Sequence, residues 1–146
     1  MKKCCALLLA AALLFGLAGC SGIAPALPEQ PTEFSGETFV NPSDPEDTYL
    51  SIDYNGRTYI GYGTLKGTLR KDDVGECLGY VVHQDGVKME DERICLLQAD
   101  PDANYLVRLF AGGFMDQPDF FRAVDTAGKE IPTPAFIDDL GYDFWK

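Results

Sequence analysis

The chain has 146 residues, of which 23 are acidic and 12 are basic, so its formal net charge at pH 7 is −11. A chain of this length suits one domain with its own apolar core. Because an acidic surface repels phosphate groups, we expect neither nucleic acid nor anionic lipid head groups among its partners.

The first segment has the layout of a leader for export. Lys2 and Lys3 supply a positive start, residues 6–17 form an apolar run, and Ala18 and Gly19 are small enough for a peptidase cleft. A helix over this run is about 18 Å long, which is short of the roughly 30 Å hydrocarbon core of a bilayer. The pattern therefore favours a cleaved signal peptide over residues 1–19 rather than a permanent membrane span.

The residues at the end of this segment, Leu17-Ala18-Gly19-Cys20, resemble the lipobox of bacterial lipoproteins. The resemblance implies a diacylglycerol group on the Cys20 thiol, cleavage before Cys20, and a protein held at the extracytoplasmic face of the cell membrane. Two or three acyl chains anchor a protein durably, whereas one holds it only marginally. In general character the rest of the chain is similar to small lipoproteins of Gram-positive gut bacteria.

Residues 20–35 have the composition of a tether. Pro25, Pro28 and Pro31 recur at every third position, which is the period of a polyproline II helix. Such a segment is extended and reaches about 3 Å per residue. We therefore expect a single β-rich domain over residues 36–146, held away from the membrane.

The body of the chain begins with hairpin signals. A short strand is expected at 37–40, a turn-rich stretch follows at 41–47, and alternation of apolar and polar residues then leads to Asn55-Gly56. Asn-Gly between alternating runs favours a type I′ turn, because both central residues need positive φ. The pattern predicts a hairpin with Tyr54 opposite Arg57 and Ile52 opposite Tyr59. A bend or bulge in its second strand is indicated by Gly61, Gly63 and Gly67.

Two further strands are expected at 77–83 and 93–98. If they fold back about Gly86, Cys77 lies opposite Cys95. Opposed residues of an antiparallel pair are about 4.5–5.5 Å apart at Cα, which is within disulfide range. An exported protein permits this oxidation, so we predict a disulfide. The alternatives are a reduced pair, and a register shifted by the acidic run 90–92.

The usual signatures of catalysis and metal binding do not occur in the sequence. His83 is the only histidine, and there is no Cys-x-x-Cys or Gly-x-Ser-x-Gly pattern. The stretch from Asp100 to Asn104 is rich in oxygen ligands but lacks the Gly and Glu that an EF-hand loop requires. We therefore expect no catalytic residue, cofactor or metal ion.

The second half of the body continues the strand pattern. Strands are expected at 105–110 and 120–125, joined by a loop over residues 111–118. Phe114 and Met115 lie beside two glycines in that loop. They either pack into the core or form an exposed apolar tip for a partner.

The C-terminus is expected to hold the one helix of the chain. Thr133 is a suitable cap, Pro134 suits the first helical position and Gly141 suits the end, so a short helix is predicted over Pro134–Leu140. Three aromatic residues follow, namely Tyr142, Phe144 and Trp145. They either plug the open end of the fold or form a stacking platform for a peptide or carbohydrate.

Short strands at near-regular spacing predict a mostly β fold, a small antiparallel barrel or sandwich with one short C-terminal helix. For function, we expect a membrane-anchored binding or accessory domain for a protein, peptide or glycan of the cell envelope. One alternative is an inhibitor or protective protein against an exported enzyme, steered to a basic target by its negative charge. Another is a hydrolase of envelope polymers that uses a carboxylate pair from Asp72, Asp73 and Glu76.

Overall fold

The computed structural model describes residues 22–112 and 117–146, and these residues form short strands joined by turns and single 3-10 turns. Cys20, Phe114 and Met115 lie outside the described residues. The strands are β1 (Thr32–Ser35), β2 (Glu37–Asn41), β3 (Asp44–Tyr54), β4 (Arg57–Leu65), β5 (Val74–Val82), β6 (Lys88–Leu97), β7 (Tyr105–Phe110), β8 (Asp119–Ala123) and β9 (Ile137–Asp139). The 3-10 turns are η1 (Lys71–Asp73), η2 (Val124–Thr126) and η3 (Asp143–Trp145).

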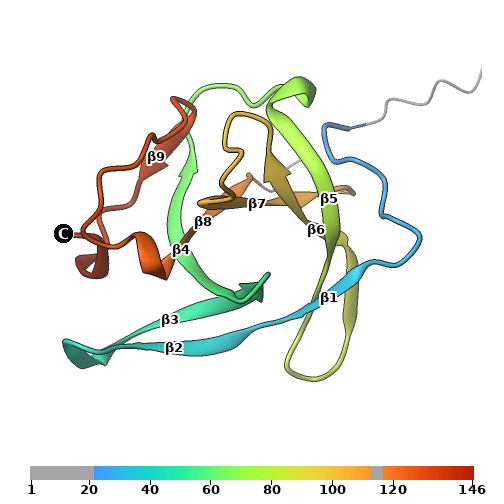
Figure 1. The fold of residues 1–146 in the computed structure, drawn as a ribbon. Helices are drawn as coiled ribbons and strands as arrows, with labels where there is room; N and C mark the ends of the chain where they lie inside the picture. The colour runs from blue at the N-terminus through green and yellow to red at the C-terminus, as the bar shows by residue number, and fades with distance from the viewer. Residues whose placement is uncertain (1–21, 113–116) are drawn as a thin grey trace, which may run out of the picture.

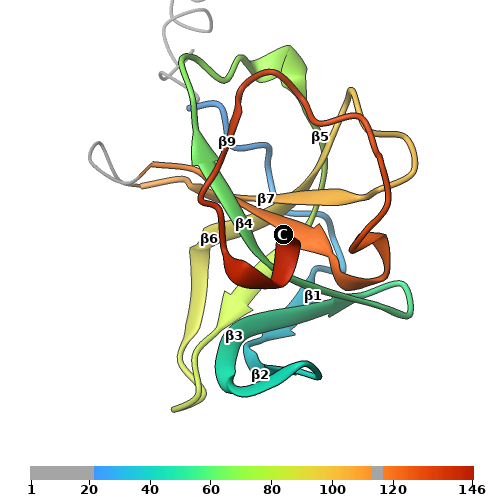
Figure 2. The same cartoon turned by 90° about the vertical axis from the view of Figure 1, so that its left-hand side faces the viewer.

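All of these strands belong to one sheet, which curls into a half-barrel (Figures 1 and 2). The order is β1-β5-β6-β7-β8-β4-β3-β2, and β9 pairs separately with β4. The two outermost strands, β1 and β2, are consecutive in the chain and are joined by Gly36. A Cβ at Gly36 would lie 2.7 Å from Leu50 Cδ1. The glycine therefore lets the chain pass close to β3 as it crosses from β1, which pairs with β5, to β2, which pairs with β3. The predicted mostly β fold is confirmed, as a curled half-barrel.

The predicted C-terminal helix over Pro134–Leu140 is wrong. The segment makes a turn, in which the Ile137 amide donates to the Pro134 carbonyl at 3.0 Å, and continues as β9 along the edge of β4. Seven residues nucleate an isolated helix poorly, whereas pairing with β4 satisfies the backbone and leaves Ile137 only 7% exposed. Gly63 makes this possible, because a Cβ there would lie 2.5 Å from the Asp138 carbonyl oxygen.

The N-terminal part of the domain also differs from the expected tether over residues 20–35. β1 lies parallel to β5, and Phe34 is only 2% exposed. Before β1, Ile23 and Leu27 are partly buried against the outer face of the sheet, and the Arg93 guanidinium donates to the Pro25 carbonyl. The domain therefore begins before residue 36, because these apolar side chains gain more from burial than from an extended conformation in water.

The predicted hairpin and its register are confirmed. Tyr54 pairs with Arg57, Ile52 pairs with Tyr59, and Asn55 and Gly56 both have positive φ. The ladder between β4 and β8 shifts between Gly61 and Gly63, which confirms the predicted bulge.

Cys77 pairs with Cys95 as predicted, although the surrounding ladder is not a uniform hairpin. Pairing steps from Tyr80 with Arg93 to Val81 with Met89, and this leaves the acidic run 90–92 outside the β5–β6 register. A second shift follows the cysteine pair. The ladder thus contains bulges on both sides of Tyr80.

Successive side chains of each strand point to opposite faces of the sheet, and both faces bury an apolar cluster. The inner cluster lies in the hollow of the half-barrel and comprises Phe34, Ile52, Tyr59, Leu78, Val81, Ile94, Leu106, Phe121 and Ala123. The outer cluster is covered by the N-terminal and C-terminal segments and includes Tyr62, Leu69, Val74, Cys77, Cys95, Leu97, Tyr105, Val107, Leu109, Phe120 and Ile137.

Candidate ligand-binding clefts

The first candidate site lies where β3 leaves β4. β3 pairs with the first half of β4 as far as Ile60, and β9 pairs with the second half from Gly63 onward. Between them the C-terminal segment bonds to the edge of β4. The Leu140 amide donates to the Tyr62 carbonyl at 3.0 Å, and Trp145 Nε1 donates to the Gly61 carbonyl at 3.1 Å. A cleft opens between this segment and β3.

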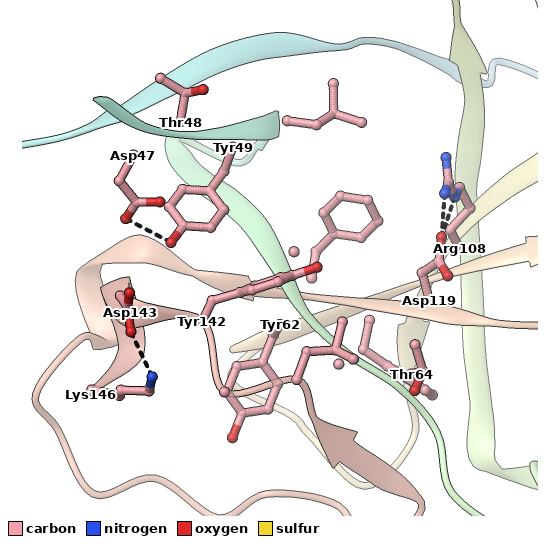
Figure 3. Close-up of a pocket in the computed structure, with 17 residues that line it drawn as sticks. Asp47, Thr48, Tyr49, Tyr62, Thr64, Arg108, Asp119, Tyr142, Asp143 and Lys146 are labelled. Carbon is pink, nitrogen blue, oxygen red and sulfur yellow. Dashed lines mark hydrogen bonds and ion pairs between the residues drawn. The ribbon is translucent and has the colours of Figure 1, made fainter. Parts of the chain in front are cut away.

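This aromatic cleft has a volume of about 750 Å³, which is within the range of ligand pockets in proteins. Its walls come from β3, β4, β7, β8 and the C-terminal segment (Figure 3). The polar and aromatic lining residues are Asp47, Thr48, Tyr49, Tyr62, Thr64, Arg108, Asp119, Phe120, Phe121, Tyr142, Asp143 and Lys146.

Two tyrosines form one wall of the aromatic cleft. The rings of Tyr49 and Tyr142 have centroids 5.5 Å apart and are tilted by 52°. Tyr142 is 38% exposed, and its Cε2 lies 3.6 Å from the point where a Cβ on Gly61 would stand. Gly61 therefore leaves the space that this ring uses, and the ring remains open to a ligand.

Asp47 adjoins this wall and fixes Tyr49. Asp47 Oδ2 accepts hydrogen bonds from the Tyr49 hydroxyl at 2.7 Å and from Asn41 Nδ2 at 2.9 Å. The pKa of Tyr49 is raised above its ordinary value, first because burial disfavours the phenolate and then because its hydroxyl donates to this carboxylate. Tyr49 thus stays neutral at physiological pH and keeps a fixed orientation.

Arg108 lines both this cleft and a neighbouring one, and it forms the centre of a chain of charges. Its Nε donates to Asp119 Oδ2 at 3.0 Å, and its Nη1 donates to Glu92 Oε2 at 3.4 Å. Glu92 Oε1 in turn lies 3.5 Å from Nε2 of His83. The guanidinium carbon of Arg108 is also 5.9 Å from the ring centroid of Phe121. These contacts hold a half-buried cation in place on the inner face.

A second, more apolar cleft of about 460 Å³ adjoins the first. It lies where the chain passes from β1 to β2, and its walls include Gly36, Ile52, Val81, Val82 and His83. Leu50, Arg108 and Phe121 line both clefts, so the two share a wall. Together they form the open end of the half-barrel.

The predicted aromatic surface is divided by the structure. Tyr142 lines the aromatic cleft, whereas Phe144 and Trp145 are half-buried behind it. Phe144 packs edge-on against Phe39 and Trp145, with ring centroids 5.2 Å and 4.8 Å away. Phe144 and Trp145 therefore support the cleft wall, and Tyr142 is the ring that a ligand can reach.

The carboxylates suggested for a hydrolase lie elsewhere. Asp72 and Asp73 belong to η1, where Asp73 Oδ2 accepts a hydrogen bond from the Arg70 amide at 2.7 Å and caps the turn. Among the described residues, neither of these two nor Glu76 lines either cleft. Among all the described residues, 22–112 and 117–146, no three His, Cys, Asp or Glu side chains lie close enough together to hold a metal ion.

Cys77 and Cys95 are both buried and both present as free thiols. The neighbouring Cys77 sulfur and burial together raise the pKa of Cys95 well above its ordinary value. The pair thus lies side by side in the outer cluster. Its oxidation to a disulfide stays a prediction.

Asp47, Tyr49 and Arg108 were not singled out from the sequence. Arg108 could have been noticed in the sequence, because it is a charged residue at the centre of the apolar strand 105–110. Asp47 and Tyr49 were harder to notice, since an acidic residue in a turn-rich stretch and a tyrosine in a strand are common features.

No helix of the described residues is both long and apolar enough to cross a bilayer. Comparison of the chain with protein-family models, with curated proteins and with solved structures finds no similar protein.

Proposed function

We propose that this protein is a binding or accessory domain of the cell envelope, anchored to the membrane by an acylated Cys20, and that its ligand binds in the aromatic cleft. The single observation that supports this function is the lining of the open end of the half-barrel. The exposed Tyr142, the half-buried Tyr49 and several charged side chains line a cleft of about 750 Å³ there, at positions where a purely structural domain would bury apolar ones.

The anchor is tested with two cysteine variants of the full chain. Cys20→Ser removes the thiol that would carry lipid, so we expect the protein to lose acyl label and to leave the membrane fraction. Cys5→Ser is the matched control, because it lies in the leader and should leave both properties unchanged. Membrane retention of Cys20→Ser would contradict the anchor.

The cleft is tested by binding measurements with the full chain. Trp145 is the only tryptophan and packs on Tyr62 at a ring distance of 5.6 Å, so its fluorescence reports on the cleft. We expect a peptide or a cell-wall glycan fragment to change this fluorescence, and Tyr142→Ala to weaken its binding at least tenfold. Tyr54→Ala, at the tip of the β3–β4 hairpin, is the matched control. Binding that is unaffected by Tyr142→Ala would place the ligand elsewhere.

The net charge of −11 favours a second candidate, an inhibitor or protective protein for a basic exported enzyme. In that case the partner should bind tightly at low salt and be released at about 0.5 M salt, where charges are screened beyond about 4 Å. A neutral ligand would show little salt dependence.

A further inference from the structure

We propose that the aromatic cleft binds the cationic side chain of a peptide segment, with a lysine or arginine placed beside Asp47 and against the rings of Tyr49 and Tyr142. The proposal rests on the proposed function and names its ligand class. Three features support it: the Asp47 carboxylate, the rings of Tyr49 and Tyr142, and the adjoining apolar cleft.

The carboxylates of the cleft differ in their partners. Asp119 forms an ion pair with Arg108, and Asp143 forms one with Lys146. Asp47 is half-buried, yet no Lys, Arg or His of residues 22–112 and 117–146 lies within 4 Å of its carboxylate. A partly buried carboxylate is stabilised by an opposite charge, so a cationic ligand would supply what the domain does not.

One oxygen of Asp47 is available for this contact. Both hydrogen bonds to its carboxylate, from Tyr49 and Asn41, end on Oδ2. They hold the group in one orientation, and among the described residues no hydrogen bond ends on Oδ1. An acceptor that is fixed in place and still has free lone pairs suits an ammonium or guanidinium donor.

The neighbouring rings favour the same charge. A cation is attracted to the face of an aromatic ring within about 6 Å of its centroid, and tyrosine is among the effective partners. Tyr142 and Tyr49 lie side by side next to Asp47 (Figure 3). Since the Tyr49 hydroxyl donates a hydrogen bond to Asp47, electron density shifts toward its ring, which strengthens the attraction.

The second cleft indicates a peptide rather than a small amine. It opens directly beside the first across Leu50 and Phe121, and its other walls include Ile52, Val81 and Val82. A basic side chain in the aromatic cleft would therefore place a neighbouring apolar side chain in the second one. The negative charge of the whole chain would draw such a basic segment toward the site.

The test uses three probes with the full chain and Trp145 fluorescence. They are a blocked peptide of alternating lysine and leucine, the same peptide with glutamine in place of lysine, and a neutral chito-oligosaccharide. We expect the lysine peptide to bind about tenfold or more tightly than the glutamine peptide at low salt, and to lose most of this advantage at about 0.5 M salt. A peptide of lysine and serine should bind more weakly than the peptide of lysine and leucine.

Two variants locate the charge. Asp47→Asn keeps an oxygen acceptor for Tyr49, so it should retain the thermal stability of the parent while its affinity for the lysine peptide falls about tenfold, to that of the glutamine peptide. Glu130→Gln, at an exposed position that lines neither cleft, removes the same charge and should change the affinity less than twofold. Equal losses in both variants would show general charge attraction and would overturn the proposal.

The other outcomes separate this proposal from the proposed function. If the glutamine peptide or the oligosaccharide binds as tightly as the lysine peptide, and Tyr142→Ala abolishes that binding, the cationic ligand class is wrong and the cleft still functions in binding. If none of the three probes binds, the cationic ligand class is overturned. The proposed function is then tested separately, by binding measurements with other peptides and cell-wall glycan fragments.

Discussion

The half-barrel has a filled end and an open end, and the same strands supply both. On β4, Tyr59 is fully buried, whereas Gly61, two residues further along, lines the aromatic cleft. On β7, Leu106 is fully buried, whereas Arg108 lines both clefts. Each step of two residues keeps the side chain on the same face and replaces an apolar filler with a small or charged residue.

This difference shows how one strand pattern can serve stability and recognition at once. At the filled end, removal of apolar area from water stabilises the fold, and each side chain is enclosed by its neighbours. At the open end, glycines leave volume, and ion pairs keep charged groups in fixed positions. Substitutions at the two ends should therefore affect different measurements.

Phe34→Ala should have the largest effect on stability. Phe34 is the main apolar side chain that β1 contributes to the inner cluster, and phenylalanine-to-alanine changes in cores cost about 3–5 kcal/mol. Denaturant unfolding would measure the loss. Leu50→Ala, at a 51% exposed position of the open end, is the control and should cost under about 0.5 kcal/mol. Similar losses for both variants would remove the distinction between the two ends.

Gly63→Ala should lower both the stability of the fold and binding in the cleft. Its new Cβ would lie 2.5 Å from the Asp138 carbonyl oxygen and 2.8 Å from Ile137 Cγ2, so β9 must move away from β4. We expect a loss of about 1–3 kcal/mol in the free energy of unfolding, together with weaker binding in the aromatic cleft. Gly61→Ala is the matched control, since its Cβ meets only Tyr142 at 3.6 Å and should leave stability nearly unchanged.

Arg57→Ala tests the turn that closes the filled end. The Arg57 guanidinium donates to Asp125 at 2.8 Å and to the carbonyl of Ala103 at 2.9 Å, so its loss should cost about 1–2 kcal/mol. Arg57 also lowers the pKa of Asp125 below its ordinary value of 3.8. The stabilisation from this pair is therefore complete above pH 3.8 and is lost as the pH falls through the lower, folded-state pKa.

The corresponding measurement is unfolding free energy against pH. Between neutral pH and the acid range the parent should lose more stability than Arg57→Ala, because the variant lacks the guanidinium that donates to Asp125 and the pKa of Asp125 rises toward 3.8. Parallel pH profiles for the two proteins would show that Asp125 gains nothing from this contact.

Gly61→Val should have the smallest effect on stability and a clear effect on binding. The branched side chain would occupy the space against the Tyr142 ring in the aromatic cleft, and valine is well tolerated in strands. We expect a change in unfolding free energy within about 1 kcal/mol and a loss of cleft binding of at least tenfold. Unchanged binding would mean that the ligand does not reach the inner part of the cleft.

Local signals in the sequence predicted the parts of the fold that depend on neighbouring residues. Asn55-Gly56 predicted the hairpin and its register, because the turn chemistry and the strand alternation agree there. The pair of Cys77 and Cys95 was predicted on the same principle. The ladder around the pair contains bulges, and one of them leaves out the acidic run 90–92, whose effect on the register was the alternative raised from the sequence.

Contacts between distant segments were not predictable in this way. Thr32 pairs with Gly79, and a side chain at Gly79 would overlap the Thr32 backbone, so β1 depends on a glycine far along the chain. The prolines before β1 suggested an extended tether for the same residues. The aromatic cleft draws Asp47, Arg108 and Tyr142 from separate segments, and no spacing in the sequence brings them together.

The N-terminal segment packs on the sheet from Ile23 onward, and this would restrict how an anchored domain faces its surroundings. With lipid on Cys20, as proposed, three residues of chain could place the anchor at most about 10 Å from Ile23, which already packs on the sheet. Figures 1 and 2 both place the start of the described chain at the opposite end of the molecule from the β2–β3 hairpin. The domain would therefore rest close to the bilayer with limited rotation, and the β3 wall of its cleft would point outward, toward ligands that arrive from outside the cell membrane.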